Sequence, residues 1–217
     1  ETIESLMAMP SGRGNGSEKN DIYAIGATCL SLLCGKNLLS DLSVAEVIRL
    51  KMKKGSFNVL STDEKIPTGL VSVFKGLLAD DVSARWNFIQ TYNYLEGKTP
   101  YIASHNLQEK LKRSLTINGE KCYSAKEVAY ALFLNPNDGW DIIKSKKLLE
   151  WVKNGLENEE IYANLEKLIN QTDEAASHEI TISQVCILLD PAAPIHVRDI
   201  SVFPDGASKA IYYCCLL

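Results

Sequence analysis

The stretch from Asp21 to Gly35 constrains the fold of this chain more than any other segment. An α-helix has about 3.6 residues per turn, and at that spacing the apolar residues of the stretch cover nearly its whole circumference. They are Ile22, Tyr23, Ala24, Ile25, Ala27, Cys29, Leu30, Leu32, Leu33 and Cys34. A water-soluble helix that is apolar all round is buried on every side. We therefore expect a central helix, ended by Gly35, around which neighbouring helices pack.

The composition excludes several classes of protein. Among 217 residues, 27 are acidic and 23 are Lys or Arg, for a net charge of -4, whereas a dedicated nucleic-acid binder carries a surplus of basic residues. Hydrophobic residues make up 46% of the chain, as in an ordinary globular protein, but no apolar run reaches the ~18 residues of a membrane span. Six cysteines without a CxxC pair favour a reducing compartment. We expect a cytoplasmic protein with neither nucleic acid nor membrane as a partner.

Capping residues and periodicity predict three further helices within residues 1–99. Ser43 and Glu46 have the spacing of a capping box, which opens a helix that runs to about Lys54. Residues 68–79 have apolar residues at helical spacing, and Ser83 is placed to cap a fourth helix. Four basic residues of the helix after Ser43 are expected to stay in water, either as a plain solvated face or as a docking site for an acidic partner: Arg49, Lys51, Lys53 and Lys54.

A moderately basic linker is expected at residues 100–114, followed by a second unit at residues 115–217. Asn118-Gly119 lies between two short segments rich in strand-forming residues, which is typical of a β-hairpin. The patterns that follow predict helices at residues 124–134, 140–153 and 157–171, a helix or a strand at 179–189, and a short extended segment at 195–203. The expected fold class is mainly α, with a helical bundle first and then a small helical module that carries a short hairpin.

Three segments within residues 1–97 carry a resemblance to a known family. Asp21-Ile22-Tyr23-Ala24-Ile25-Gly26 resembles the D-[VIL]-[WY]-[SA]-x-G segment that opens the buried central helix in the C-terminal lobe of serine/threonine protein kinases, the bacterial ones included. The helix that ends at Lys53-Lys54-Gly55 is similar to the surface helix with which kinases dock substrates. Leu77-Leu78-Ala79-Asp80-Asp81-Val82-Ser83-Ala84-Arg85 is similar to the L-L-x-x-D-P-x-x-R segment of the family.

The resemblance implies structural roles for four residues. Asp21 would hold the backbone of the catalytic loop, and Gly26 belongs to the same segment. Arg85 would pair with the glutamate of the family's A-P-E motif, for which Glu4 is the candidate. Residues 4–10 do not spell that triplet, and the glycine-rich loop at 12–16 lengthens the spacing to Asp21.

The residues with which a protein kinase binds ATP and transfers phosphate lie upstream of these segments. His196-Val197-Arg198-Asp199 and Pro204-Asp205-Gly206 resemble the catalytic-loop and magnesium-binding motifs, but they follow the central helix. Their chain order makes both matches coincidental. We therefore predict no catalytic residue, no metal ligand and no cofactor in this chain, and ATP and Mg²⁺ only where an upstream half is present.

The expected function is that of a portion of a serine/threonine protein kinase-like protein, inactive alone, that supplies the lobe core and a docking surface for substrates or partners. The chain starts at Glu1 and ends in apolar residues, so we expect both ends to be cuts through a longer chain, with the missing upstream half as the partner. Two alternatives stay open. One is a pseudokinase-type scaffold for protein–protein interaction, and the other is an unrelated all-helical adaptor.

Overall fold

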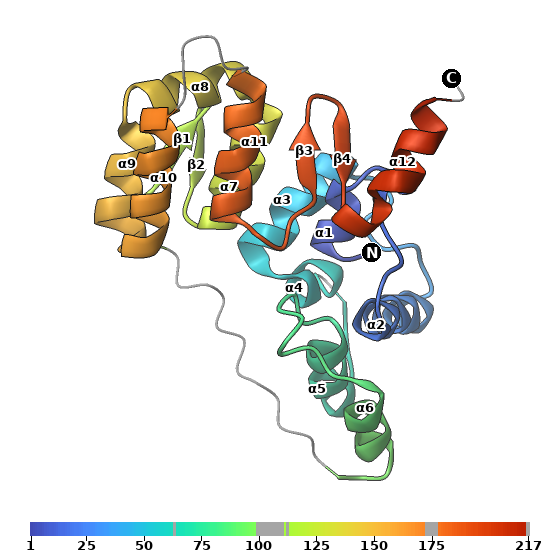
Figure 1. The fold of residues 1–217 in the computed structure, drawn as a ribbon. Helices are drawn as coiled ribbons and strands as arrows, with labels where there is room; N and C mark the ends of the chain where they lie inside the picture. The colour runs from blue at the N-terminus through green and yellow to red at the C-terminus, as the bar shows by residue number, and fades with distance from the viewer. Residues whose placement is uncertain (63, 99–110, 112, 172–177, 216–217) are drawn as a thin grey trace. The chain divides into compact units, whose positions relative to one another are not determined.

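The computed structural model describes residues 1–62, 64–98, 111, 113–171 and 178–215 and is shown in Figure 1. The expected linker at residues 100–114 therefore lies largely outside the described residues. Helices dominate the described chain, and its strands form two antiparallel hairpins. The expectation of a mainly α fold with a short hairpin is confirmed.

The chain divides into two compact units, which are described separately. The first comprises Glu1–Met7 with Asn15–Leu107, and the second comprises Ala8–Gly14 with Gln108–Leu217. We expected residues 8–14 to belong to the first unit. They join the second because the backbone N–H of Met9 donates to the carbonyl of Ser201 at 2.9 Å, and that of Phe203 donates to the carbonyl of Gly12 at 2.8 Å.

The described residues of the first unit form six helices. They are α1 (Ile3–Met7), α2 (Glu18–Cys34), α3 (Val44–Lys54), α4 (Ser56–Leu60), α5 (Thr68–Leu77) and α6 (Phe88–Leu95). The predicted capping box is present at the start of α3, where Ser43 accepts from the backbone of Glu46 and the Glu46 carboxylate accepts from Ser43 N–H at 2.8 Å. The helix that we expected to begin at Ser83 begins later, because Ser83 bonds the Asp81 carboxylate and Asn87 caps α6 instead.

Helix α2 is buried on one side only within the described residues. Its inner side carries Tyr23 and Leu30, which are fully buried against Phe74 and Leu78 in the core of this unit. The opposite side is exposed, and Leu32 on it is 75% exposed. The prediction that the Asp21–Gly35 helix is buried all round is therefore wrong for the described chain, because α5 packs against one face and no described helix covers the other.

The second unit surrounds a larger apolar core. Its elements are β1 (Leu115–Ile117), β2 (Glu120–Cys122), α7 (Ala125–Leu134), α8 (Pro136–Lys144), α9 (Lys147–Trp151), a π-helical turn (Val152–Leu156), α10 (Glu159–Gln171), α11 (His178–Leu189), β3 (Ile195–Val197), β4 (Ile200–Val202) and α12 (Ala207–Cys214), with short 3₁₀ turns at Pro10–Gly12 and Pro204–Gly206. The apolar run after residue 178 is thus a helix. The pattern that predicted one helix over 140–153 is divided in two, because Lys146 has a positive φ of 60°.

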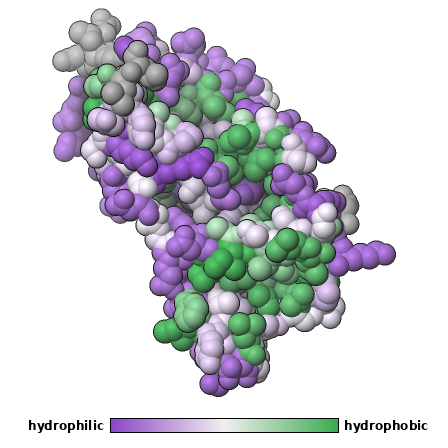
Figure 2. All heavy atoms as spheres, turned by 90° about the vertical axis from the view of Figure 1, so that its right-hand side faces the viewer, coloured by the Kyte–Doolittle hydropathy of each residue, from purple (hydrophilic) through white to green (hydrophobic). Residues whose placement is uncertain are grey.

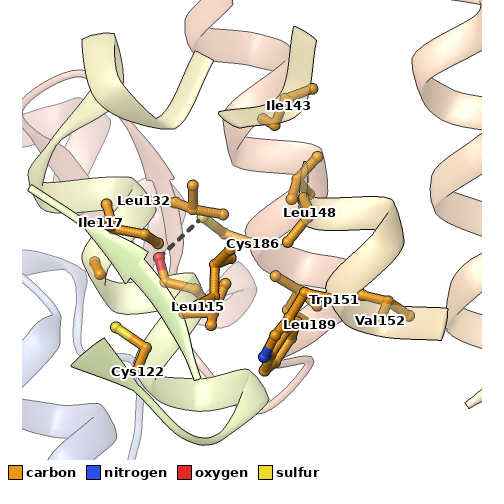
Figure 3. Close-up of a cluster of buried hydrophobic side chains, with 14 of the residues drawn as sticks. Leu115, Ile117, Cys122, Leu132, Ile143, Leu148, Trp151, Val152, Cys186 and Leu189 are labelled. Carbon is orange, nitrogen blue, oxygen red and sulfur yellow. Dashed lines mark hydrogen bonds between the residues drawn. The ribbon is translucent and has the colours of Figure 1, made fainter. Parts of the chain in front are cut away.

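The predicted hairpin at Asn118-Gly119 is confirmed. Both turn residues have positive φ, 46° and 76°, as the two-residue turn of a tight hairpin requires. The register pairs Leu115 with Cys122, so that both side chains point into the core together with Ile117 (Figure 3). The hairpin closes this core on one side, while α7, α9 and α11 supply its other walls.

Two glycines of α5 provide a matched test of the packing in the first unit. A Cβ on Gly76 would lie 2.3 Å from the ring of the buried Trp86, whereas a Cβ on Gly69 would meet nothing within 4 Å. We expect Gly76→Ala to lower the free energy of unfolding by about 1–3 kcal/mol through overpacking. Gly69→Ala should leave it unchanged or raise it by up to about 1 kcal/mol. Urea titration of both variants checks this, and equal effects would contradict the packing of Trp86 on α5.

Candidate interaction surface and the buried polar cluster behind it

Arg85 occupies the centre of the first unit. Its side chain is 1% exposed, and its Nε donates to the Ala79 carbonyl at 2.8 Å. One terminal nitrogen donates to the Lys19 carbonyl at 3.1 Å and to Asn20 Oδ1 at 3.3 Å. The guanidinium also lies over the Tyr23 ring, 5.0 Å from its centroid. Arg85 therefore joins the segment after α5 to the first turns of α2.

Glu4, the expected partner of Arg85, is partly buried in α1. Burial lowers the pKa of the Arg85 guanidinium, and the charge of Glu4 is the largest of the charges that oppose this by raising it. Glu4 thus acts on Arg85 electrostatically. The hydrogen bonds of Arg85 described above go to backbone carbonyls and an amide oxygen.

Lys51 was expected in water with its basic neighbours, and this prediction is wrong. The side chain is 4% exposed, and its Nζ donates to Tyr23 Oη at 2.9 Å and to the Glu1 carbonyl at 2.8 Å. Position 51 lies three residues after the buried Ile48, on the inner side of α3. The spacing from Ile48 indicates that position 51 is buried, whereas the run of basic residues favoured an exposed position. Of the other three docking candidates, Lys53 and Lys54 are exposed and Arg49 is partly buried.

Arg85 and Lys51 belong to one buried polar cluster, which also contains the acidic residue Asp80. We define this cluster as Tyr23, Lys51, Ser56, Asp80 and Arg85. The Asp80 carboxylate accepts from the Ser56 backbone N–H at 2.8 Å and from the Ser56 hydroxyl. Burial raises the pKa of Asp80, while the two bonds from Ser56 and the charge of Lys51 lower it. Buried charges are costly unless they are paired and hydrogen-bonded. In this cluster the two cations, Lys51 and Arg85, lie near two acidic side chains, Asp80 and Glu4.

The two other residues that the resemblance singles out lie on α2. Asp21 is exposed in the first turn, where the helix dipole favours a negative charge. Gly26 is buried, and a Cβ there would lie 2.7 Å from Cβ of Leu77. Gly26 therefore lets α2 and α5 approach closely.

The exposed side of α2 carries an apolar stripe. It consists of Ile25, Cys29, Leu32 and Leu33, at the i, i+4, i+7 and i+8 positions that share one helix face. Thr28, at i+3 on the same face, is also exposed and is polar but uncharged. Cys29 is a free thiol. The stripe extends over about 12 Å of helix and contains no charged residue.

Helix α6 presents a second apolar stripe to solvent. Its members are Phe88, Ile89, Tyr92 and Leu95, all more than half exposed and with Leu95 at 77%. The first turns of the two helices are joined, since Phe88 N–H donates to the Glu18 carboxylate at 3.0 Å. Figure 2 shows apolar side chains gathered in the lower part of its view, at the level of α2 and α6 in Figure 1. We call the two stripes together the apolar surface.

The described residues offer no site for a metal ion, since they contain no group of three or more His, Cys, Asp or Glu side chains placed to hold one. His196 and Asp199, which resemble the catalytic-loop motif, lie in the β3–β4 hairpin. Within the described part of the chain, no helix combines the length and the apolar composition that a membrane span requires.

Comparisons with known proteins leave the family open. No family model matches the chain, and no solved structure matches it. A curated protein of Plasmodium falciparum (isolate 3D7), described as an uncharacterized membrane protein, is 26% identical over 141 residues. The match covers 62% of this chain and 4% of that protein, so the chain spans about 4% of the length of this relative.

Removing Arg85 should strongly destabilise the first unit. Arg85→Ala leaves the Lys19 and Ala79 carbonyls without this donor and removes one of the two buried cations near Glu4 and Asp80, so we expect a loss of about 3–5 kcal/mol in the free energy of unfolding. Lys54→Ala, at an exposed position of α3, should change it by less than about 0.5 kcal/mol. Thermal or urea unfolding compares the two, and an unchanged stability of Arg85→Ala would contradict the cluster.

Lys51 should make stability depend on pH. Burial lowers its pKa from 10.5 to about 8, against the charges of Asp80, Glu1 and Glu4, which raise it. Between those values the unfolded chain holds a proton that the folded protein has lost, so the free energy of unfolding rises with pH through this window. The full gain is about 3 kcal/mol.

The control for this pH effect is an isosteric, uncharged side chain. Lys51→Met should abolish the rise between pH 8 and 10, whereas Lys53→Met, at an exposed position, should retain it. Denaturant titrations at several pH values give the difference between wild type and each variant directly. Parallel curves for wild type and Lys51→Met would show that folding does not lower the pKa of Lys51.

Proposed function

We propose that the first unit is the last part of a serine/threonine protein kinase-like helical lobe, and that its apolar surface docks an apolar helical segment from the upstream half of the same protein. The observation that carries the proposal is the stripe on α2. This helix has apolar residues on both sides, yet the described chain covers only the side with Tyr23 and Leu30. An exposed apolar patch of this kind is typical of an interaction site.

The form of the apolar surface favours a helix as its occupant. Helix α6 reverses the usual pattern of a surface helix, because its apolar residues face solvent. An apolar stripe of helical spacing offers ridges and grooves that accept the side chains of another helix. The stripe on α2 contains no charge, so the matching face of the partner is expected to be apolar, with polar residues only along its rim.

Three features of the first unit support the kinase-like part of the proposal. Asp21 is exposed at the start of α2 and is accessible to a loop from another segment. Arg85 is buried at the end of the Leu77–Arg85 segment, and Glu4 is the leading charge that favours its charged form. The role is then to supply the core and the docking surface of the lobe in the cytoplasm, and the upstream half supplies any ATP and Mg²⁺ site.

Cys29 is a built-in probe of this proposal, since it lies within the α2 stripe and is free and exposed. We expect a maleimide to alkylate Cys29 rapidly in the isolated 217-residue chain. In the natural gene product, purified intact, alkylation should be at least tenfold slower because the docked segment covers the thiol. Peptide mapping by mass spectrometry measures the rate at each cysteine.

Cys122 is the control, because it is a free cysteine that is buried in the second unit. Its alkylation should be slow in both the isolated chain and the intact gene product, since docking on the first unit does not change its burial. Equal rates for Cys29 in the two samples, or a natural gene product no larger than 24.0 kDa, would overturn the proposal.

A further inference from the structure

Residues 8–14, which we call the strap, belong to the second unit, although the chain on both sides of them belongs to the first. The Met9 N–H donates to the Ser201 carbonyl at 2.9 Å. Further along, the Phe203 N–H donates to the Gly12 carbonyl at 2.8 Å. The strap therefore runs beside β4 in the same direction. Because β3 pairs with β4 on the other edge, the strap covers an edge of backbone groups that would otherwise be open.

Three glycines make this close contact possible. A Cβ on Gly12 would lie 2.6 Å from a side chain of β4, and one on Gly14 would meet the Asp205 carboxylate. A Cβ on Gly206, in the turn after β4, would lie 2.7 Å from the backbone nitrogen of Gly14. By contrast, a Cβ on Gly16, just beyond the strap, would meet nothing within 4 Å. The glycines of the strap therefore fit it to β4 and to the turn that follows.

Helix α12 forms the third side of this contact. It begins at Ala207, directly after the turn Pro204–Gly206, and packs on Pro10–Gly12. Gly12 is buried among these elements, whereas Pro10 is exposed. We call the surface formed by β4, the turn after it and α12 the strap site.

The strap is attached to the second unit without being part of its large apolar core. That core lies among the β1–β2 hairpin and helices α7 to α11, and none of its described members comes from the strap or from the strap site. Release of the strap would therefore leave the core intact. It would open the Ser201 carbonyl and the Phe203 N–H, and a strand edge with unpaired backbone groups pairs readily with another extended segment.

We propose that the second unit is a peptide-recognition module, in which the strap occupies the binding site as an intrachain ligand and leaves before a partner segment of the same chemistry binds. That segment has an apolar residue followed by proline, and then two glycines on either side of a basic residue, as in residues 9–14. The backbone bonds along β4 supply affinity. The close contacts at the glycines supply specificity, because a larger residue does not fit there. This inference concerns the second unit and does not depend on the function proposed for the first.

Hydrogen exchange of the full chain tests whether the strap leaves while the second unit stays folded. The amides of Met9 and Phe203 both bond between the strap and the strap site, so one local opening should expose both. We expect each to exchange about 100-fold faster than the amide of Leu132 in the core helix α7, because a local opening costs less free energy than unfolding. Equal rates at the three positions would overturn the proposal, since the strap would then leave only when the unit unfolds.

A fluorescent peptide with the sequence of residues 8–14 tests recognition between separate molecules. In wild type the strap competes with the peptide at the high effective concentration of a tethered ligand. The double variant Gly12→Ala/Gly14→Ala of the full chain should lose its strap from the site, and should therefore bind the peptide about ten times more tightly than wild type. Fluorescence anisotropy measures the affinity, and ¹⁵N spectra should place the saturable shifts at Ser201 and Phe203.

Two controls are matched to these glycines. Gly16→Ala, where the added Cβ meets nothing, should bind the peptide as weakly as wild type does. A second peptide, with alanine at both glycine positions of the strap, should not bind the double variant. The proposal is wrong if a double variant that remains folded by circular dichroism shows no saturable binding, or if it binds the two peptides equally. If the double variant does not fold, the exchange rates of Met9 and Phe203 decide alone.

Discussion

The stacking of Arg85 on Tyr23, with Lys51 bonded to the hydroxyl of the same tyrosine, is the constraint on which the first unit depends. Both cations are buried, and a buried cation persists only where carbonyls and carboxylates are held around it. Meeting that demand brings together Glu1, just before α1, the start of α2, the end of α3 and the segment after α5. The inner side of α2 is thereby fixed, and its second apolar side is left to face outward. The cluster and the packing of α5 thus bury the same side of α2, and the apolar stripe of α2 lies on the other side.

Local signals in the sequence account for most of the secondary structure. Capping residues such as Ser43 and the turn residues Asn118-Gly119 act over a few positions, so their effects could be predicted correctly. Long-range contacts could not. Lys51 was expected in water because its neighbours are basic, and only the three-dimensional positions of Tyr23 and Glu1 make its burial possible. The division of residues 140–153 into two helices likewise follows from the positive φ of Lys146. A lysine in the sequence does not indicate a positive φ.

The candidate sites were predicted less completely than the fold, for a similar reason. The apolar residues of α2 and α6 were recognised, but amphipathic spacing indicates which residues share a face and not whether the rest of the chain covers that face. The strap site of the second unit joins residues 8–14 with β4 and the turn after it. The glycines of the strap predicted a loop, but sequence spacing alone did not reveal its hydrogen bonds with Ser201 and Phe203. The apolar surface and the strap site lie in separate units.

The central claim is that a helical segment of the same protein covers the second side of α2. Site-specific photo-crosslinking tests it most directly, with a benzophenone amino acid at position 32 of the intact natural gene product in its own cells. Position 200 is the control, since Ile200 is also exposed but lies in the second unit. The account predicts one dominant crosslink from position 32 to an apolar helical peptide upstream of Glu1. Crosslinks from position 32 that are no more abundant than those from position 200, or that reach no upstream peptide, would contradict it.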